Sequence, residues 1–88
     1  MVKVKKSEKI AFEKKDEKLR GLAKKCFPEL KVSGLSVFMS ITEGANSVLD
    51  FGMGIVHLYD RKYFDRANQF AQQYEKILGY EVDLYEEY

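Results

Sequence analysis

Two stretches of the chain alternate hydrophobic and polar residues with the period of two that is typical of β-strands. In residues 35–42 and 49–56, a hydrophobic side chain occupies every odd-numbered position. Residues that oppose each other in antiparallel strands lie on the same side of the sheet, so both odd-numbered sets should point to one face. The pattern therefore predicts a hairpin with four cross-strand pairs: Ile41 with Leu49, Met39 with Phe51, Val37 with Met53, and Leu35 with Ile55.

The predicted register leaves residues 44–46, with the sequence Gly-Ala-Asn, as a three-residue loop between the two strands. A loop of this length commonly ends with a residue in the left-handed region of backbone conformation, which asparagine tolerates better than most residues. We therefore expect a positive φ at Asn46.

Hydrophobic residues spaced three and four apart predict two helices, one before the hairpin and one after it. The first covers residues 8–27 and should end at Pro28, because the residue before a proline disfavours helical conformation. The second covers residues 61–78 and is the more regular of the two. Its boundaries are marked by Asp60 as the N-cap and by Gly79 as the terminating residue.

A last strand is predicted at residues 80–86, where hydrophobic residues again alternate. The elements indicate a single α+β domain over residues 1–88. We expect a two-layer sandwich, in which a central antiparallel hairpin and the C-terminal strand are covered on one face by two helices. Residues 1–6 form either a flexible basic tail or a short strand at 2–5. With that strand the arrangement is ferredoxin-like, and without it the sheet has three strands.

The even-numbered face of the predicted hairpin carries small residues, one aromatic ring and two glycines. Glycine weakens a strand, so it usually marks a bend, a bulge or a close approach to the backbone. One interpretation is structural: Gly52 makes room for the Phe38 ring, which shields the strand. The other is that this face is a platform for a protein partner or for a second copy of the chain. The platform would consist of Ser36, Phe38, Ser40, Gly52 and Gly54.

Charge is distributed unevenly along the chain, although the formal net charge is only +1. Residues 1–31 carry eleven Lys and Arg against five Asp and Glu, whereas residues 32–88 carry four against nine. A basic face favours nucleic acid or an acidic partner, but interspersed acids are also typical of an ordinary solvated helix. The nucleic-acid alternative would use Lys3, Lys5, Lys6, Lys9, Lys14, Lys15, Lys18, Arg20, Lys24 and Lys25.

The sequence offers little for catalysis or metal binding. One cysteine and one histidine cannot form an internal disulfide or the usual zinc site. We expect Cys26 in the core, because it lies on the apolar stripe near a helix C-terminus, where the dipole opposes a thiolate. We expect a non-enzymatic protein without cofactor or metal. A small enzyme that uses His57 with Asp60 or Cys26 is a third class of function.

Length and composition fit one small globular domain of 88 residues, 45% hydrophobic and 33% charged. The longest apolar runs are far shorter than the roughly 18 residues of a membrane span. The basic start, residues 1–6, is not followed by the apolar segment of a signal peptide. We therefore expect a cytoplasmic interaction module that binds a protein partner or itself.

Overall fold

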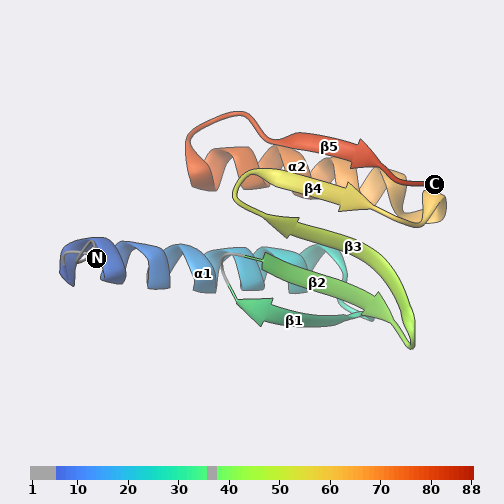
Figure 1. Cartoon of the computed structure of the whole chain (residues 1–88), viewed down its shortest axis with the longest axis horizontal. Helices are drawn as coiled ribbons and strands as arrows, with labels where there is room; N and C mark the ends of the chain where they lie inside the picture. The colour runs from blue at the N-terminus through green and yellow to red at the C-terminus, as the bar shows by residue number, and fades with distance from the viewer. Residues whose placement is uncertain (1–5, 36–37) are drawn as a thin grey trace.

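The computed structural model describes residues 6–35 and 38–88 (Figure 1). The predicted strand at residues 2–5 lies outside this part of the chain, as do Ser36 and Val37. In chain order the elements are α1 (Lys6–Cys26), β1 (Lys31–Leu35), β2 (Phe38–Glu43), β3 (Asn46–Gly52), β4 (Ile55–Leu58), η1 (Arg61–Tyr63), α2 (Phe64–Leu78) and β5 (Asp83–Glu86).

The described strands form one five-stranded sheet in the order β1-β2-β3-β4-β5. Neighbours from β1 to β4 are antiparallel, and β5 pairs with β4 in parallel after the chain has crossed over through α2. Both α-helices lie on one face of the sheet, which confirms the predicted two-layer α+β sandwich (Figure 1). The described order of helix, four strands, helix and strand differs from the ferredoxin-like alternative.

The predicted hairpin register is right near the loop and wrong at the open end of the hairpin. Two predicted pairs are confirmed: Met39 with Phe51, and Ile41 with Leu49. Beyond them each predicted arm folds back and forms two strands instead of one. Leu35 therefore pairs with Phe38, and Ile55 pairs with Gly52, so the predicted pair between Leu35 and Ile55 is wrong. The fourth predicted pair involves Val37, which lies outside the described residues.

A two-residue turn at Met53 and Gly54 joins β3 to β4 and changes which residue numbers point inward. Both residues have a positive φ, 53° and 82°, as a type I′ hairpin turn requires. Across the turn Phe51 pairs with Val56, so an even-numbered residue now shares the inner face with an odd-numbered one. Met53 and Ile55, which the alternation predicts to be buried, are 74% and 39% exposed.

The turn between β2 and β3 contains two residues, Gly44 and Ala45, because Glu43 pairs with Asn46. Gly44 has a φ of 60°, whereas Asn46 is not in the left-handed region, so the predicted conformation of Asn46 is wrong. A glycine with positive φ in the first of two positions is typical of a type II′ turn. The turn is one residue shorter than predicted because a β-bulge at the step from Ile41 to Thr42 takes up a residue of β3.

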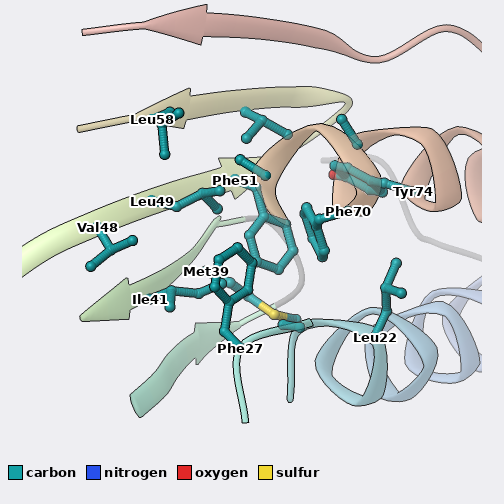
Figure 2. Close-up of a cluster of buried hydrophobic side chains, with 14 of the residues drawn as sticks. Leu22, Phe27, Met39, Ile41, Val48, Leu49, Phe51, Leu58, Phe70 and Tyr74 are labelled. Atoms are coloured by element: carbon teal, nitrogen blue, oxygen red, sulfur yellow. The ribbon is translucent and has the colours of Figure 1, made fainter. Parts of the chain in front are cut away.

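The core lies between the sheet and the two helices and is built around aromatic rings (Figure 2). The ring of Phe51 meets Phe70 and Tyr74 of α2 edge to face, with centroids 4.7 and 5.5 Å apart. Such pairs are worth about 0.5–1.5 kcal/mol beyond the area they bury. Phe27, just after α1, is fully buried, and its ring lies 6.3 Å from that of Phe70. One aromatic cluster therefore joins both helices to the middle of the sheet.

The helix boundaries agree well with the sequence prediction. The Asp60 carboxylate accepts a hydrogen bond from the backbone N–H of Lys62 at 3.1 Å and begins η1, which leads into α2. Gly79 ends α2 with a φ of 81°. The first helix ends at Cys26, two residues before Pro28. The local signals of capping residue, glycine and proline therefore mark the helix ends correctly.

Arg66 fastens the end of α1 to α2. Its Nε donates to the backbone carbonyl of Cys26 at 3.0 Å, and its terminal nitrogen donates to the Glu29 carboxylate, which lowers the pKa of Glu29. The guanidinium also lies over the rings of Phe27 and Tyr63, 5.0 and 5.2 Å from their centroids. Arginine suits this position because its planar fork stacks and hydrogen-bonds at the same time. Cys26 itself packs against the core, as predicted, and burial raises the pKa of its thiol.

Candidate protein-interaction surface

The outer face of the sheet is the side turned away from α1 and α2, and no described helix or strand covers it (Figure 1). Strand pairing arranges its side chains in rows that cross the sheet. The middle row, from β1 to β5, consists of Ser33, Ser40, Asp50, His57 and Tyr85. The row begins with small side chains and ends with two rings.

A second row of the outer face, nearer the β3–β4 turn, holds two exposed apolar side chains and ends in β5 at the exposed Asp83, which pairs with Ile55. Ile55 pairs with Gly52, and Phe38 lies on the other side of Gly52 by the β2–β3 register. Phe38 is 54% exposed and Ile55 is 39% exposed. Because Gly52 places no side chain between them, two apolar side chains stand in this row with an open position in the middle.

Polar contacts connect the side chains on the β3, β4 and β5 part of the outer face. The Tyr59 hydroxyl donates to the Asp50 carboxylate at 2.9 Å, and this hydrogen bond raises the pKa of Tyr59. His57 Nδ1 lies 2.8 Å from a carboxylate oxygen of Glu87. The His57 ring also stacks on the Tyr85 ring, with centroids 5.6 Å apart. Side chains that are already held in place lose less conformational entropy when a partner binds.

The structure brings only part of the predicted platform together. Phe38, Ser40 and Gly52 lie on the outer face, in the rows described above. Ser36 lies outside the described residues. Gly54 is buried in the β3–β4 turn and is therefore not part of the open surface.

Gly54 is required for close packing of the turn. Its N–H donates to the Tyr74 hydroxyl at 3.0 Å, and its carbonyl accepts from the N–H of Asp83 at 3.0 Å. A Cβ at this position would lie 2.8 Å from Cε2 of Tyr80. The glycine therefore serves a close approach by side chains of the same chain.

The predicted platform leaves out several residues of the outer face, among them Ile55, His57 and Tyr85. The first two are missed because the odd-numbered alternation assigns them to the inner face, and the β3–β4 turn reverses that assignment. A signal is present in the sequence, since Val56 and Leu58 stand on either side of the polar His57 after Gly54. Tyr85 follows from the strand pattern of residues 80–86 only once β5 is known to lie beside β4.

The residues of the catalytic alternative are not brought together. The Asp60 carboxylate caps η1, and the His57 ring contacts Glu87 instead. Cys26 packs on the helix side of the sheet, whereas His57 lies on the outer face. Within the described ranges, no cluster of three or more His, Cys, Asp or Glu side chains could hold a metal ion.

The residues of the nucleic-acid alternative lie mainly on α1. Four of them have exposed side chains: Lys15, Lys18, Lys24 and Lys25. Arg20 donates to the backbone carbonyl of Gly34 in β1, at a distance of 2.6 Å. The side chains of the other five lie outside the described part of the chain: Lys3, Lys5, Lys6, Lys9 and Lys14.

Among the helices that the structure describes, none is both long and apolar enough to cross a membrane. No protein-family model, curated protein or solved structure matches this chain. Function is therefore inferred from the surface and its side chains.

Proposed function

We propose that this chain is a small non-enzymatic interaction module that binds a protein, either another protein or itself, through the outer face of its sheet. The proposal rests on one observation: helices cover the inner face of the sheet but not the outer face. Both helices pack on the inner face, while Phe38, Ile55 and Tyr85 stay exposed on the outer face. Complete burial of one large apolar side chain contributes about 1.5–3 kcal/mol. Phe38, Ile55 and Tyr85 are 54%, 39% and 48% exposed, so a protein that covers them recovers about half of this amount per side chain.

The arrangement of side chains on the outer face also supports protein binding. Phe38 and Ile55 lie toward the β3–β4 turn, beside a middle row in which Asp50 and His57 already have hydrogen-bond partners, and protein interfaces combine apolar and polar side chains of this kind. Pairing at the β1 edge is a less suitable mode, because Arg20 already binds the carbonyl of Gly34 there. The face of the sheet is therefore a better binding surface than this edge.

The test is site-specific photo-crosslinking from position 38. Phe38 is replaced by the photoreactive analogue benzoylphenylalanine, which keeps an aromatic ring on the outer face. The matched control places the same analogue at Gln73, which is exposed on α2. Crosslinking is carried out with the purified chain and in the cells that produce it. The proposal predicts adducts from position 38, their loss when Ile55→Lys is added to the same chain, and none from position 73.

An adduct with a second copy or with another protein supports the proposal when it depends on Ile55. The proposal is overturned if position 38 gives no adduct in either setting. It is also overturned if positions 38 and 73 give the same adducts, or if Ile55→Lys leaves the adducts unchanged, because contact through the outer face requires both side chains.

We also propose that the module works in the cytoplasm. Its single cysteine, Cys26, is a free thiol packed against the core, and free thiols are usual in reducing compartments.

Nucleic-acid binding through α1 is the second candidate function. It is favoured by four exposed lysines and by the N-terminal part of α1, which extends beyond the ends of the strands (Figure 1). Lysines on such a helix would bind phosphates without reading sequence. The logarithm of the affinity should then fall linearly with the logarithm of salt concentration, with a slope of about −0.9 per neutralised phosphate on duplex DNA.

The nucleic-acid candidate is tested with the double variant Lys18→Glu and Lys25→Glu, which should weaken binding and reduce the salt slope. Lys76→Glu, at an exposed position of α2, is the control and should have little effect. Absence of retention on duplex and single-stranded oligonucleotides at low salt removes this candidate.

A further inference from the structure

We propose that the partner at the outer face is a second copy of this chain, an inference that rests on the proposed function. The two copies pack face to face about a two-fold axis that runs along β3. Such an axis keeps the strand direction and reverses the strand order, so β1 and β2 of one copy meet β5 and β4 of the other. The two halves of the outer face differ in size, hydrophobicity and charge in a way that fits this arrangement.

Side-chain size in the middle row is complementary under the two-fold operation. The β1 and β2 positions are Ser33 and Ser40, which are small, and the β4 and β5 positions are His57 and Tyr85, which are bulky. The axis sets Ser40 against His57 of the second copy, and Ser33 against Tyr85. Small side chains therefore meet large ones on both sides of the central Asp50 position, as close packing of two sheets requires.

In the second row the two exposed apolar side chains are complementary, whereas Asp83 at the β5 end is set against the Leu35 position of the second copy. Phe38 in β2 and Ile55 in β4 stand on either side of Gly52, which lies on the axis in β3. The two-fold operation sets Phe38 of one copy against Ile55 of the other, and it does so twice. These two contacts bury four exposed apolar side chains of the dimer. Between the contacts, the two copies of Gly52 allow the sheets to approach closely.

Opposite charges lie at the two ends of the third row. Lys31 pairs with Thr42 at the β1 edge and is exposed, and Glu87 follows β5, where its N–H donates to the carbonyl of Leu58 at 2.8 Å. Within one chain these two residues are separated by four strand spacings, about 19 Å, so they cannot form an ion pair. Across the two-fold axis, Lys31 of each copy faces Glu87 of the other, whose carboxylate also contacts His57 Nδ1 of its own chain at 2.8 Å.

Asp50 lies on the axis in the middle row, so the two Asp50 carboxylates face each other. The Tyr59 hydroxyl donates to each of them, but like charges at this position oppose association. The Asp50→Asn variant should therefore associate more tightly than the wild type, which is the opposite of what loss of a favourable polar contact would produce.

The size of the outer face sets the expected strength of the dimer. Five strands about 4.8 Å apart make a face roughly 24 Å wide and, at the length of these strands, roughly 15 Å long. Two such faces cover roughly 700 Å² together, which is below the roughly 1,000 Å² of a stable specific interface. The dimer should therefore be weak, with a Kd on the order of 10 µM.

The experiment is sedimentation equilibrium on the wild type, on Lys31→Glu, on Glu87→Lys and on an equimolar mixture of the two variants. In either variant alone, both symmetry-related contacts hold like charges. The Kd should therefore rise about tenfold. In the mixture each altered residue meets the altered residue of the other chain. Opposite charges are then restored in both contacts, and association should return to near the wild-type value. Lys76→Glu on α2 is the control and should associate like the wild type.

Recovery in the mixture supports the two-fold dimer, because the two charges can meet only between chains. The inference is overturned if the wild type is monomeric up to about 1 mM, where an association free energy of roughly −4 kcal/mol would already populate the dimer. It is also overturned if Phe38→Asp leaves the dimer intact or if the mixture is no tighter than its components. A monomer whose position 38 still crosslinks to another protein overturns the dimer and leaves the proposed function standing.

Discussion

The inner and outer faces of the sheet are formed by the same strands, yet helices cover the inner face and leave the outer face exposed. Ile55 and Val56 show the difference most directly, because they are neighbours in β4 with almost the same side-chain chemistry. Val56 is fully buried under the helices, whereas Ile55 is 39% exposed. Adjacent residues of a strand point to opposite faces, so their environments are set by what covers each face. Hydrophobicity alone therefore does not identify the core of this sheet.

The strongest test of the comparison is to remove one aromatic ring from each face. Phe51→Ala should cost about 3–5 kcal/mol in the free energy of unfolding, because it leaves a cavity beside Phe70 and Tyr74. Phe38→Ala should cost about 1 kcal/mol or less, because its ring shields only a strand glycine from water. The measurement is urea unfolding of both variants at low protein concentration, where association contributes nothing. A larger loss for Phe38→Ala would mean that the outer face is covered and that the assigned faces are wrong.

Much of the inner face can be predicted from the sequence because its signals are local. In α2 the spacing of hydrophobic residues, the capping Asp60 and the terminating Gly79 lie within the element itself. The pairs Met39 with Phe51 and Ile41 with Leu49 follow from alternation around a short loop. These features depend on neighbouring residues, so they are visible without the rest of the fold.

The outer face is harder to predict because it depends on the β3–β4 turn. Odd-numbered hydrophobic residues continue from Phe51 through Met53 to Ile55, so alternation conceals the turn between them. The turn is held by contacts with residues far along the chain, from Tyr74 and Asp83 to Gly54. Phe38, Ser40 and Gly52 are found because they precede the turn, whereas Ile55 and His57 are missed because they follow it.

Gly54→Ala breaks the turn that separates the two faces. The substitution places a side chain at a φ of 82° and against the Tyr80 ring, so it should cost about 2 kcal/mol. Gly79→Ala is the matched control, since its φ is 81° but nothing lies within 4 Å of its Cβ, and it should cost about 1 kcal/mol. Urea unfolding compares the two losses. In a Tyr80→Ala background the Gly54 loss should fall to the Gly79 value, and an unchanged difference would rule out the Tyr80 contact as its cause.

Stability should fall at alkaline pH because Tyr63, on the inner side of the sheet, loses its hydroxyl proton. Its hydroxyl donates to the Glu43 carboxylate, and this hydrogen bond, together with burial, raises the pKa of Tyr63 to about 12. An unfolded tyrosine ionises near pH 10. The stabilisation is therefore complete below about pH 10 and is lost as pH rises from there to about 12. Ultraviolet titration of tyrosinate, with Tyr63→Phe as the reference, isolates this group. Glu43→Gln should lower its pKa, and an unchanged titration would contradict the assigned hydrogen bond.

Met53→Asn should stabilise the protein by making the β3–β4 turn, which separates the two faces, more favourable. Met53 has a φ of 53° and is 74% exposed, so it bears the cost of the left-handed conformation without burying its side chain. Asparagine followed by glycine is the favoured sequence for a type I′ turn, and the variant should gain about 0.5–1 kcal/mol in the free energy of unfolding. Met53→Leu is the control: it keeps the size and the unfavourable φ, and should stay within about 0.5 kcal/mol of the wild type. Urea unfolding measures both, and an equal gain in the leucine variant would show that the backbone conformation of residue 53 is not the source of the stabilisation.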